Sequence, residues 1–267
     1  WTSAFGETIL QAGKNEPKLV AITAAMPDGT GLVKFREEFP DRYIDVGINE
    51  SHAMVLAAGI AKSGMKPLVA IYSTFMQRAM DQIFHDVCLQ GLNVILCMDR
   101  AGLVGSDGAV HHGTMDIAML RSMPGITLMA PGDANELQAA LDLAISLDGP
   151  SAIRYPREET PEPLPVPGKC PEFTPGKARV ISEGTDGTFL CYGSIIENAM
   201  TAAQQLTAQG LSIGVVNARF AKPLDTTLIS QLIATGKPIV TCEDHAATGG
   251  FGTAGIEAAC QMGLSAA

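Results

Sequence analysis

The sequence has few aromatic residues, few charged residues and no long hydrophobic run. Aromatic side chains make up 5% of the 267 residues and charged ones 17%, whereas 46% are hydrophobic. This composition excludes a disordered or fibrous chain, and the length predicts about two globular domains. The longest apolar stretches, such as Leu92 to Met98, are far shorter than the roughly 18 residues of a membrane span. We therefore expect a soluble chain with no membrane partner.

Basic residues are scarce as well. The 18 Lys and Arg residues are outnumbered by 28 Asp and Glu residues, which leaves a formal charge of -10 and no basic run to neutralise nucleic-acid phosphates. We therefore expect a small-molecule or protein partner and no nucleic acid. The six cysteines form no C-x-x-C pair, and no histidine cluster accompanies them to predict a zinc site. We expect them to be reduced and mostly buried, as in an intracellular protein.

Short apolar runs alternate with longer Ala-rich stretches of helical period, a pattern typical of β-α units. The predicted fold is α/β, with two open, mostly parallel sheets flanked by helices. Asp133 is expected to cap one helix, with Glu136 three residues further on. In residues 1–158 the expected strands are 19–22, 43–46, 67–72, 93–98, 125–129 and 152–155, and the expected helices are 5–12, 52–63, 75–90 and 134–146.

A proline-rich stretch, residues 159–175, is predicted to be a linker because proline disfavours both helices and central strands. A second β-α pattern follows over residues 176–267. Its first helix is expected to start at a capping box formed by Ser194 and Glu197. The expected strands are 188–192, 212–217 and 238–243, and the expected helices are 194–209, 223–235 and 251–262. No strand follows the last helix, so we expect this second domain to be incomplete.

Ligands bind at the carboxyl ends of parallel strands, so the residues just after each strand are the candidates for a site. Glu50 follows the second strand at a helix start. It is either a helix cap or a partly buried acid whose pKa is raised enough to exchange a proton near neutrality. Tyr72, Phe75 and Arg78 share the next junction. Phe75 is either a core residue or a stacking surface beside an anion-binding arginine.

A glycine-rich loop over residues 99–113 follows the fourth strand and contains Arg100, Asp107 and the pair His111-His112. Loops of this length are usually functional, and one histidine is either an acid/base group or a solvated side chain. Adjacent histidines do not point to one side, so no metal site is predicted.

Arginines end the sixth strand, and a glycine-rich turn lies near the end of the chain. Arg154 and Arg157 suit a phosphate or carboxylate, or they pair with Glu158 and Glu159. The turn over residues 243–252 is weak evidence for nucleotide binding. No phosphate-binding G-x-x-x-x-G-K-[ST] motif is present.

Taken together, these segments resemble the 1-deoxy-D-xylulose-5-phosphate synthase family, thiamine diphosphate enzymes of the transketolase superfamily. The resemblance is dense from about Thr2 to Arg157 and thinner through the turn at 243–252. The matching motifs are Phe39-Pro40-Asp41-Arg42-Tyr43-Ile44-Asp45-Val46, Glu50-Ser51-His52-Ala53, Ala70-Ile71-Tyr72-Ser73-Thr74-Phe75-Met76-Gln77-Arg78-Ala79, Asp99-Arg100-Ala101-Gly102, Gly105-Ser106-Asp107-Gly108-Ala109-Val110-His111 and Gly149-Pro150-Ser151-Ala152-Ile153-Arg154-Tyr155-Pro156-Arg157.

The resemblance implies a pyrimidine-binding domain over residues 1–158 and a C-terminal domain over residues 176–267. It implies a transferase that joins pyruvate to D-glyceraldehyde 3-phosphate with loss of carbon dioxide, by thiamine ylide chemistry, in isoprenoid and thiamine biosynthesis. By position, Glu50 exchanges a proton with the aminopyrimidine ring of the cofactor, and His111 is a second catalytic group. Phe75 and Ile48 match cofactor-binding positions. The positions that match substrate-binding residues are Tyr72, Arg100, Asp107 and Arg157, and His52 and Arg78 lie in matching motifs without an assigned role.

The sequence also departs from this family. It has no Gly-Asp-Gly motif, which holds magnesium and the diphosphate in an N-terminal domain, and Ser51 replaces the usual glutamine after the catalytic glutamate. We therefore expect about half of an active site, with Mg²⁺ ligands on a missing N-terminal domain, and no activity for the chain alone.

The resemblance further implies a homodimer in the bacterial cytoplasm or the plastid stroma. The alternatives are a split transketolase, the beta subunit of a 2-oxo acid dehydrogenase, and a non-catalytic scaffold.

Overall fold

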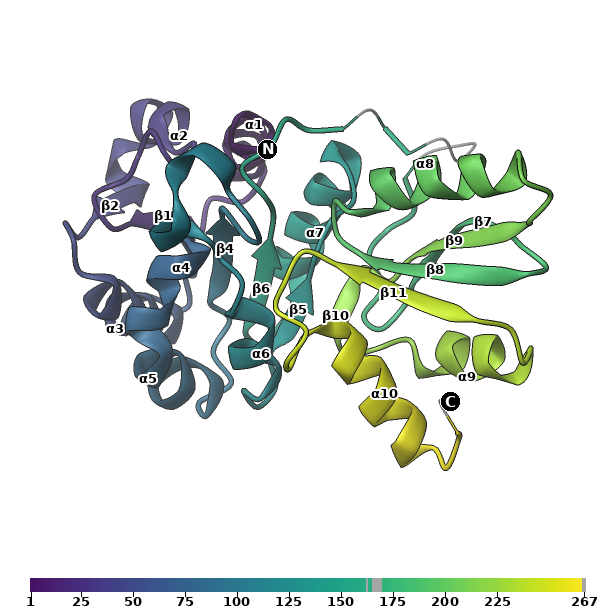
Figure 1. Ribbon diagram of the computed structural model, residues 1–267. Helices are drawn as coiled ribbons and strands as arrows, with labels where there is room; N and C mark the ends of the chain where they lie inside the picture. The colour runs from purple at the N-terminus through teal and green to yellow at the C-terminus, as the bar shows by residue number, and fades with distance from the viewer. Residues whose placement is uncertain (162, 165–169, 266–267) are drawn as a thin grey trace.

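The computed structural model describes residues 1–161, 163–164 and 170–265, which form two open sheets lying side by side with helices on their faces (Figure 1). The first sheet has seven strands in the order β10-β5-β6-β4-β3-β1-β2, and the second has four in the order β11-β8-β9-β7. All pairings are parallel except β10 with β5 and β7 with β9. The predicted fold class of two mostly parallel sheets is therefore confirmed.

The predicted strands and most of the predicted helices occur, with ends that differ by a few residues. The strands are β1 (Leu19–Thr23), β2 (Tyr43–Asp45), β3 (Lys66–Tyr72), β4 (Ile95–Asp99), β5 (Thr127–Met129), β6 (Ser151–Arg154), β7 (Arg179–Ser182), β8 (Gly187–Tyr192), β9 (Ile213–Asn217), β10 (Phe220–Lys222) and β11 (Ile239–Glu243). The helices are α1 (Thr2–Asn15), α2 (Val33–Glu38), α3 (Glu50–Lys62), α4 (Ser73–Met76), α5 (Met80–Gln82), α6 (Asp116–Arg121), α7 (Ala134–Ser146), α8 (Ile196–Thr207), α9 (Thr226–Ala234) and α10 (Phe251–Gln261).

Helices cover both faces of the first sheet, so its inner strands are buried on both sides. The helices α1 and α7 pack together on one face, where Phe5 and Leu137 join the core. On the other face, Met54 of α3 belongs to a separate hydrophobic cluster. This burial explains why β1, β3 and β4 are continuous apolar runs and not alternating ones.

Two helix predictions were wrong in detail. The single helix expected over residues 75–90 is α4, a 3-10 turn, α5 and a π-helical turn over Ile83–Cys88, and such turns often mark functional sites. The capping box expected at Ser194 and Glu197 does not form, because α8 begins after Ile195 with no side-chain cap. The cap predicted for α7 does form, since the Asp133 side chain accepts a hydrogen bond from the Glu136 amide.

The strand β10 was not predicted, and it joins the two halves of the chain. It lies beyond the proline-rich stretch, yet it pairs antiparallel with β5 at the edge of the first sheet. The described residues between β6 and β7 form no helix or strand, and residues 162 and 165–169 of the predicted linker lie outside the description. Phe173 of this stretch is buried, with its ring 5.5 Å from that of Phe220.

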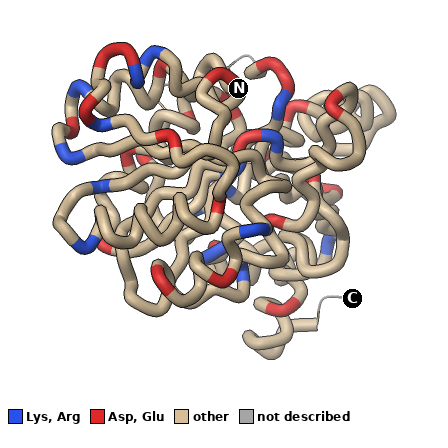
Figure 2. The backbone as a smooth tube through the Cα atoms, turned by 90° about the vertical axis from the view of Figure 1, so that its left-hand side faces the viewer, with Lys and Arg blue, Asp and Glu red and all other residues tan. Residues whose placement is uncertain are grey.

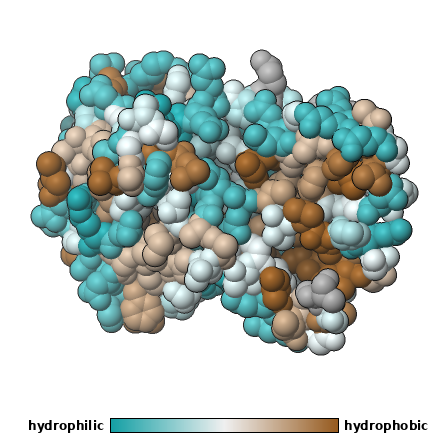
Figure 3. All heavy atoms as spheres, in the orientation of Figure 1, coloured by the Kyte–Doolittle hydropathy of each residue, from teal (hydrophilic) through white to brown (hydrophobic). Residues whose placement is uncertain are grey.

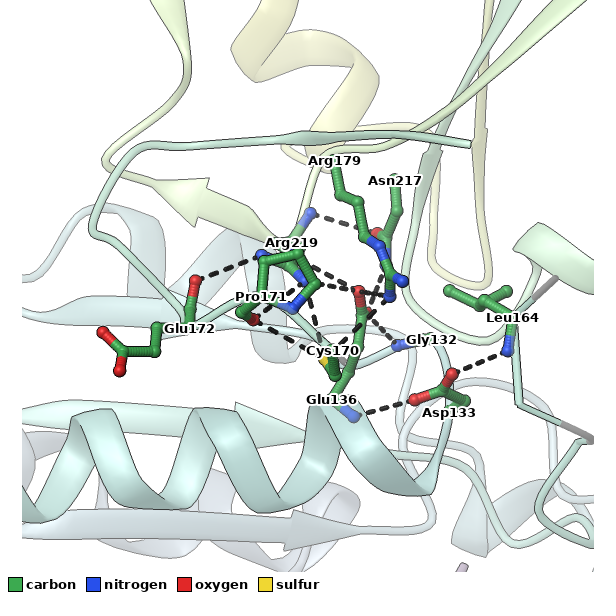
Figure 4. A network of polar contacts seen from close by, with 10 residues as sticks. All are labelled: Gly132, Asp133, Glu136, Leu164, Cys170, Pro171, Glu172, Arg179, Asn217 and Arg219. Atoms are coloured by element: carbon green, nitrogen blue, oxygen red, sulfur yellow. Dashed lines mark hydrogen bonds and ion pairs between the residues drawn. The ribbon is translucent and has the colours of Figure 1, made fainter. Parts of the chain in front are cut away.

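A buried ionic network fastens the second sheet to the first (Figure 4). The Glu136 carboxylate on α7 accepts hydrogen bonds from Arg179 at 3.1 Å, Arg219 at 2.9 Å and Asn217 at 2.6 Å. It also accepts one from the Gly132 amide at 2.9 Å. Because every carboxylate oxygen is paired, a charge that is fully shielded from water is tolerated here.

Charges of both signs are interspersed along the backbone, without a broad basic region on the side seen in Figure 2. Within residues 1–161, 163–164 and 170–265, no helix is long and apolar enough to cross a membrane. The expectation that most cysteines are buried holds for only half of them. Cys88, Cys97 and Cys191 are buried, Cys170 and Cys242 are partly exposed, and Cys260 is exposed.

Candidate active site

The candidate residues from four separate segments meet at the carboxyl ends of β2, β3, β4 and β6. The Arg100 guanidinium lies 4.0 Å from the centre of the Tyr72 ring, and the Asp107 carboxylate lies 2.9 Å from Arg157. The His111 ring lies 5.5 Å from the Phe75 ring. Parallel pairing of β3 with β4 and of β4 with β6 brings these ends together, as the edge rule for open sheets predicts.

Glu50 is a buried carboxylate at the first position of α3. It does not cap the helix, because the Asn49 side chain accepts the hydrogen bond from the His52 amide. Its partner is the Arg78 guanidinium, with which it forms a short ion pair. Ser51 supports this pair by donating a hydrogen bond to the Arg78 carbonyl at 2.7 Å. The carboxylate therefore lies in the first turn of α3 and is paired with an arginine.

An aromatic cluster lies next to this carboxylate. The Tyr72 and Phe75 rings are nearly parallel with their centres 5.8 Å apart, and the edge of His111 faces both. The Arg78 guanidinium lies 4.8 Å from the centre of the Phe75 ring, so residues at i and i+3 share a face as predicted. Burial raises the pKa of Tyr72, and its hydroxyl therefore stays a hydrogen-bond donor at neutral pH.

Arg100 is held in a left-handed backbone conformation, with φ of +59°. Its guanidinium donates to the Gly29 carbonyl at 2.7 Å, and the Asp99 carboxylate accepts a hydrogen bond from its amide at 2.7 Å. Asp99 is fully buried, and burial raises its pKa although Arg100 and Thr2 oppose the shift. These contacts fix the arginine in place, and strained positions of this kind concentrate at functional sites.

Asp107 lies between two arginines. Its carboxylate is 2.9 Å from Arg157 and 3.6 Å from Arg100. The Asp107 carbonyl lies 2.8 Å from Nδ1 of His111, which holds the histidine ring toward the aromatic cluster. Two guanidinium groups that converge on one carboxylate can also bind an external phosphate or carboxylate.

The second histidine of the loop has a structural role. Nδ1 of His112 accepts a hydrogen bond from the Val104 amide at 3.1 Å and so closes the loop. Throughout the described part of the chain, no group of three or more His, Cys, Asp or Glu side chains could hold a metal ion.

Other candidates lie apart from this cluster. Arg154 is buried and pairs with Asp116 at 2.8 Å, so the suggested pairing with Glu158 or Glu159 is wrong for this residue. Ile48, for which the family resemblance implies cofactor binding, is 83% exposed, and His52 is exposed on α3. The turn over residues 243–252 does not offer a free anion site, because the Glu243 carboxylate accepts the amides of Phe251 and Gly252 at the start of α10.

Sequence reasoning missed Asp244, which connects the second domain to the glycine-rich loop. Both oxygens of its carboxylate accept the Leu103 amide, at 3.0 and 3.2 Å. Arg154 also holds Asp244 in place, because it donates a hydrogen bond to the Asp244 carbonyl at 2.9 Å. No local pattern could reveal this contact, since 141 residues separate the two partners.

Replacing Gly102 by Ala should break this contact. Gly102 has φ of +80°, and an added Cβ would lie 1.8 Å from the Asp244 carboxylate. We expect a loss of about 2–3 kcal/mol in the free energy of unfolding, from backbone strain together with the displaced carboxylate. Gly105→Ala is the matched control, because Gly105 also has a positive φ but nothing lies within 4 Å of its added Cβ. Equal losses for both variants, measured by urea unfolding, would contradict a role for Asp244.

The chain matches two family descriptions in succession. Residues 1–163 match "Transketolase, pyrimidine binding domain" and residues 176–266 match "Transketolase, C-terminal domain". A solved structure described as "Split gene transketolase, inactive beta4 tetramer" superimposes with a TM-score of 0.88 and 31% identity, covering 97% of this chain and 84% of that one.

Curated relatives share more identity but are longer. The 1-deoxy-D-xylulose-5-phosphate synthase 1 of Geobacter sulfurreducens is 48% identical over 99% of this chain and 41% of its own length. The 1-deoxy-D-xylulose-5-phosphate synthase of Thermus thermophilus is 48% identical over 99% of this chain and 42% of its own length. The chain thus spans about two fifths of the length of these relatives.

Proposed function

Because the chain belongs to the transketolase family, we propose that it carries the pyrimidine-binding half of the active site of a thiamine diphosphate-dependent 1-deoxy-D-xylulose-5-phosphate synthase. The substrates would be pyruvate and D-glyceraldehyde 3-phosphate. The observation that carries the proposal is the convergence of a buried Glu50, a partly exposed Phe75 and two arginines at one edge of the sheet.

The residues present fit a thiamine cofactor. A flat aminopyrimidine needs an aromatic surface and a carboxylate shielded from water. Phe75 and Glu50 offer these two groups close together, since the Arg78 guanidinium contacts both of them. When bound, thiamine diphosphate supplies the carbon nucleophile that the reaction requires. Glu50 would hold and exchange a proton at a ring nitrogen, Phe75 would stack on the ring, and His111 would exchange protons with the substrate.

The arginines fit the phosphate of the aldehyde substrate. Arg157 is 43% exposed at its side chain, while Arg100 is mostly buried and braced by Asp99 and Gly29. An incoming phosphate would bind between these two arginines, and Asp107 and Tyr72 would contact the same substrate, Tyr72 as a hydrogen-bond donor. We propose that Mg²⁺ and the diphosphate are held by an N-terminal domain with the Gly-Asp-Gly motif that these 267 residues lack, and that the chain works as a homodimer.

A second candidate is the subunit of a split transketolase. The observation that favours it is the 31% identical chain of a split-gene transketolase, 84% of which is covered here. That protein is described as an inactive beta4 tetramer. The higher identity to the synthases favours the first candidate.

The chain alone should not bind thiamine diphosphate, because it offers only one side of the cofactor. Isothermal titration of thiamine diphosphate with Mg²⁺ is expected to show binding only after the N-terminal portion of a synthase relative is added. Carbon dioxide release should then require pyruvate and D-glyceraldehyde 3-phosphate together.

The control mixture contains the N-terminal portion without this chain. Turnover of a ketose phosphate donor without pyruvate would favour the split transketolase. Cofactor binding with no turnover of either donor would support a non-catalytic role.

A further inference from the structure

Two cysteines lie opposite each other in the second sheet. Cys191 on β8 and Cys242 on β11 are register partners in a parallel pair, and the two strands lie side by side in Figure 1. Cys191 is fully buried and packs with Ile196 and Val215, while Cys242 is partly exposed and packs against the same cluster. Register partners point to the same face of a sheet, so both thiols lie on the face covered by α8.

The strand geometry permits a bond between the two sulfurs. Neighbouring strands are about 4.7–4.9 Å apart, and disulfides join Cα atoms about 4.4–6.8 Å apart. The strand β11 is the outer strand of the sheet as described, so it can shift slightly to bring the sulfurs together. A small oxidant can approach from this side, where exposed apolar side chains gather in Figure 3 and where Val240 is 49% exposed.

The two thiols have unequal acidity. The contact with the Cys191 side chain lowers the pKa of Cys242, whereas the contact with Cys242, together with burial, raises the pKa of Cys191. Burial raises the pKa of Cys88, Cys97 and Cys170 as well. Cys242 is therefore both the more exposed and the more acidic thiol of the pair, and exposure and acidity are two properties of a reactive cysteine.

We propose that Cys191 and Cys242 form a reversible dithiol-disulfide site that is oxidised by hydrogen peroxide. Cys242 loses its proton, and its sulfur attacks one oxygen of hydrogen peroxide, so that the O–O bond breaks and Cys242 becomes a sulfenic acid. The other oxygen leaves as hydroxide and takes up the proton that Cys242 lost, which gives the first water. The Cys191 thiol then attacks the sulfenic sulfur, forming the S–S bond and releasing a second water. Two thiols are oxidised and one peroxide is reduced to two waters.

Oxidation of Cys242 should also change the candidate active site, through the turn that follows β11. Cys242 is two residues before Asp244, whose carboxylate accepts the Leu103 amide of the glycine-rich loop. Drawing β11 toward β8 displaces the start of this turn, and Asp244 moves with it. This shift weakens the hydrogen bond that the Leu103 amide donates to the Asp244 carboxylate.

The test treats the full chain with hydrogen peroxide and then alkylates it, followed by peptide mapping. We expect a Cys191–Cys242 linked peptide that disappears with dithiothreitol, and Cys242 in the reduced chain should be alkylated about ten times faster than Cys191. The Leu103 amide should exchange hydrogen about five times faster after oxidation, as loss of one hydrogen bond predicts. These readouts do not depend on enzymatic activity, so failure here is separate from failure of the proposed function.

Cys242→Ser should abolish the linked peptide, whereas Cys260→Ser, the same change at an exposed cysteine, should leave it intact. Circular dichroism confirms that each variant is folded. Oxidation of Cys242 to sulfinic acid with Cys191 still alkylatable would overturn the proposal. A linked peptide with unchanged Leu103 exchange would overturn the coupling to the loop.

Discussion

Replacing Glu50 with Ala should lower the turnover number of the chain, mixed with the N-terminal portion of a synthase relative, by about 10²–10⁴-fold, the usual contribution of a general acid or base. Glu50 is a buried carboxylate of the candidate site, and we propose that it moves the proton on which cofactor activation depends. Its removal leaves no buried charge without a partner, because the side chain of Arg78, with which it pairs, is 55% exposed. The loss should therefore fall on turnover, with little change in the thermal midpoint. The measurement is steady-state turnover with pyruvate and D-glyceraldehyde 3-phosphate after the N-terminal portion is added.

Asp81→Asn is the matched control, since Asp81 is an exposed carboxylate in the first turn of the nearby helix α5. Its turnover should equal that of the unmodified chain. Normal turnover by the Glu50→Ala protein would remove the mechanistic centre of the proposed function. A Glu50→Gln variant tests the proton directly, because it keeps the shape of the side chain but cannot exchange the proton.

Replacing Glu136 with Ala should lower the free energy of unfolding by about 3–5 kcal/mol, the usual effect of leaving a buried charge without its partner. Glu136 is fully buried and pairs with two arginines whose side chains are only 7% and 3% exposed. Without this side chain, Arg179 and Arg219 would lose the carboxylate with which both of them pair in Figure 4. The measurement is the shift in the urea midpoint followed by far-ultraviolet circular dichroism.

The same charge can be removed from the exposed face of α7 as a control. Asp142 bonds there to Gln138 on its own helix, and Asp142→Ala should change stability by no more than about 0.5 kcal/mol. If the two variants unfold at the same urea concentration, the ionic network does not hold the two sheets together.

Much of the fold could be predicted from the pattern of apolar residues. A strand that is buried on both faces must be a continuous apolar run, and such runs are visible in the sequence. The strands β1, β3 and β4 follow this rule. The strand β10 escaped prediction because it has three residues, too few for a period, and because its partner β5 lies 91 positions earlier in the chain. The π-helical turn at Ile83–Cys88 escaped for a different reason, since its buried residues Ile83 and Val87 are four positions apart, a spacing that an ordinary α-helix also gives.

The residue types of the candidate site were evident from the sequence, but their pairings were not. Tyr72 ends a strand, Glu50, Arg100 and Arg157 follow strands, and the strand ends of an open parallel sheet meet at one edge. Which arginine faces which acid depends on strand order and loop path. Arg157 meets Asp107 and Arg154 meets Asp116, although the adjacent Glu158 and Glu159 were equally plausible partners by sequence.

The sequence by itself determined the alternation of strands and helices, the class of sheet and the family to which the chain belongs, because these depend on local residue patterns and on motifs. The tertiary structure decided which distant groups touch. Glu136 meets Arg179 and Arg219, Asp244 meets Leu103, and Cys191 meets Cys242 only because strand order folds separate segments onto one another. Contacts of this kind are set by three-dimensional packing, which carries no local signal in the chain.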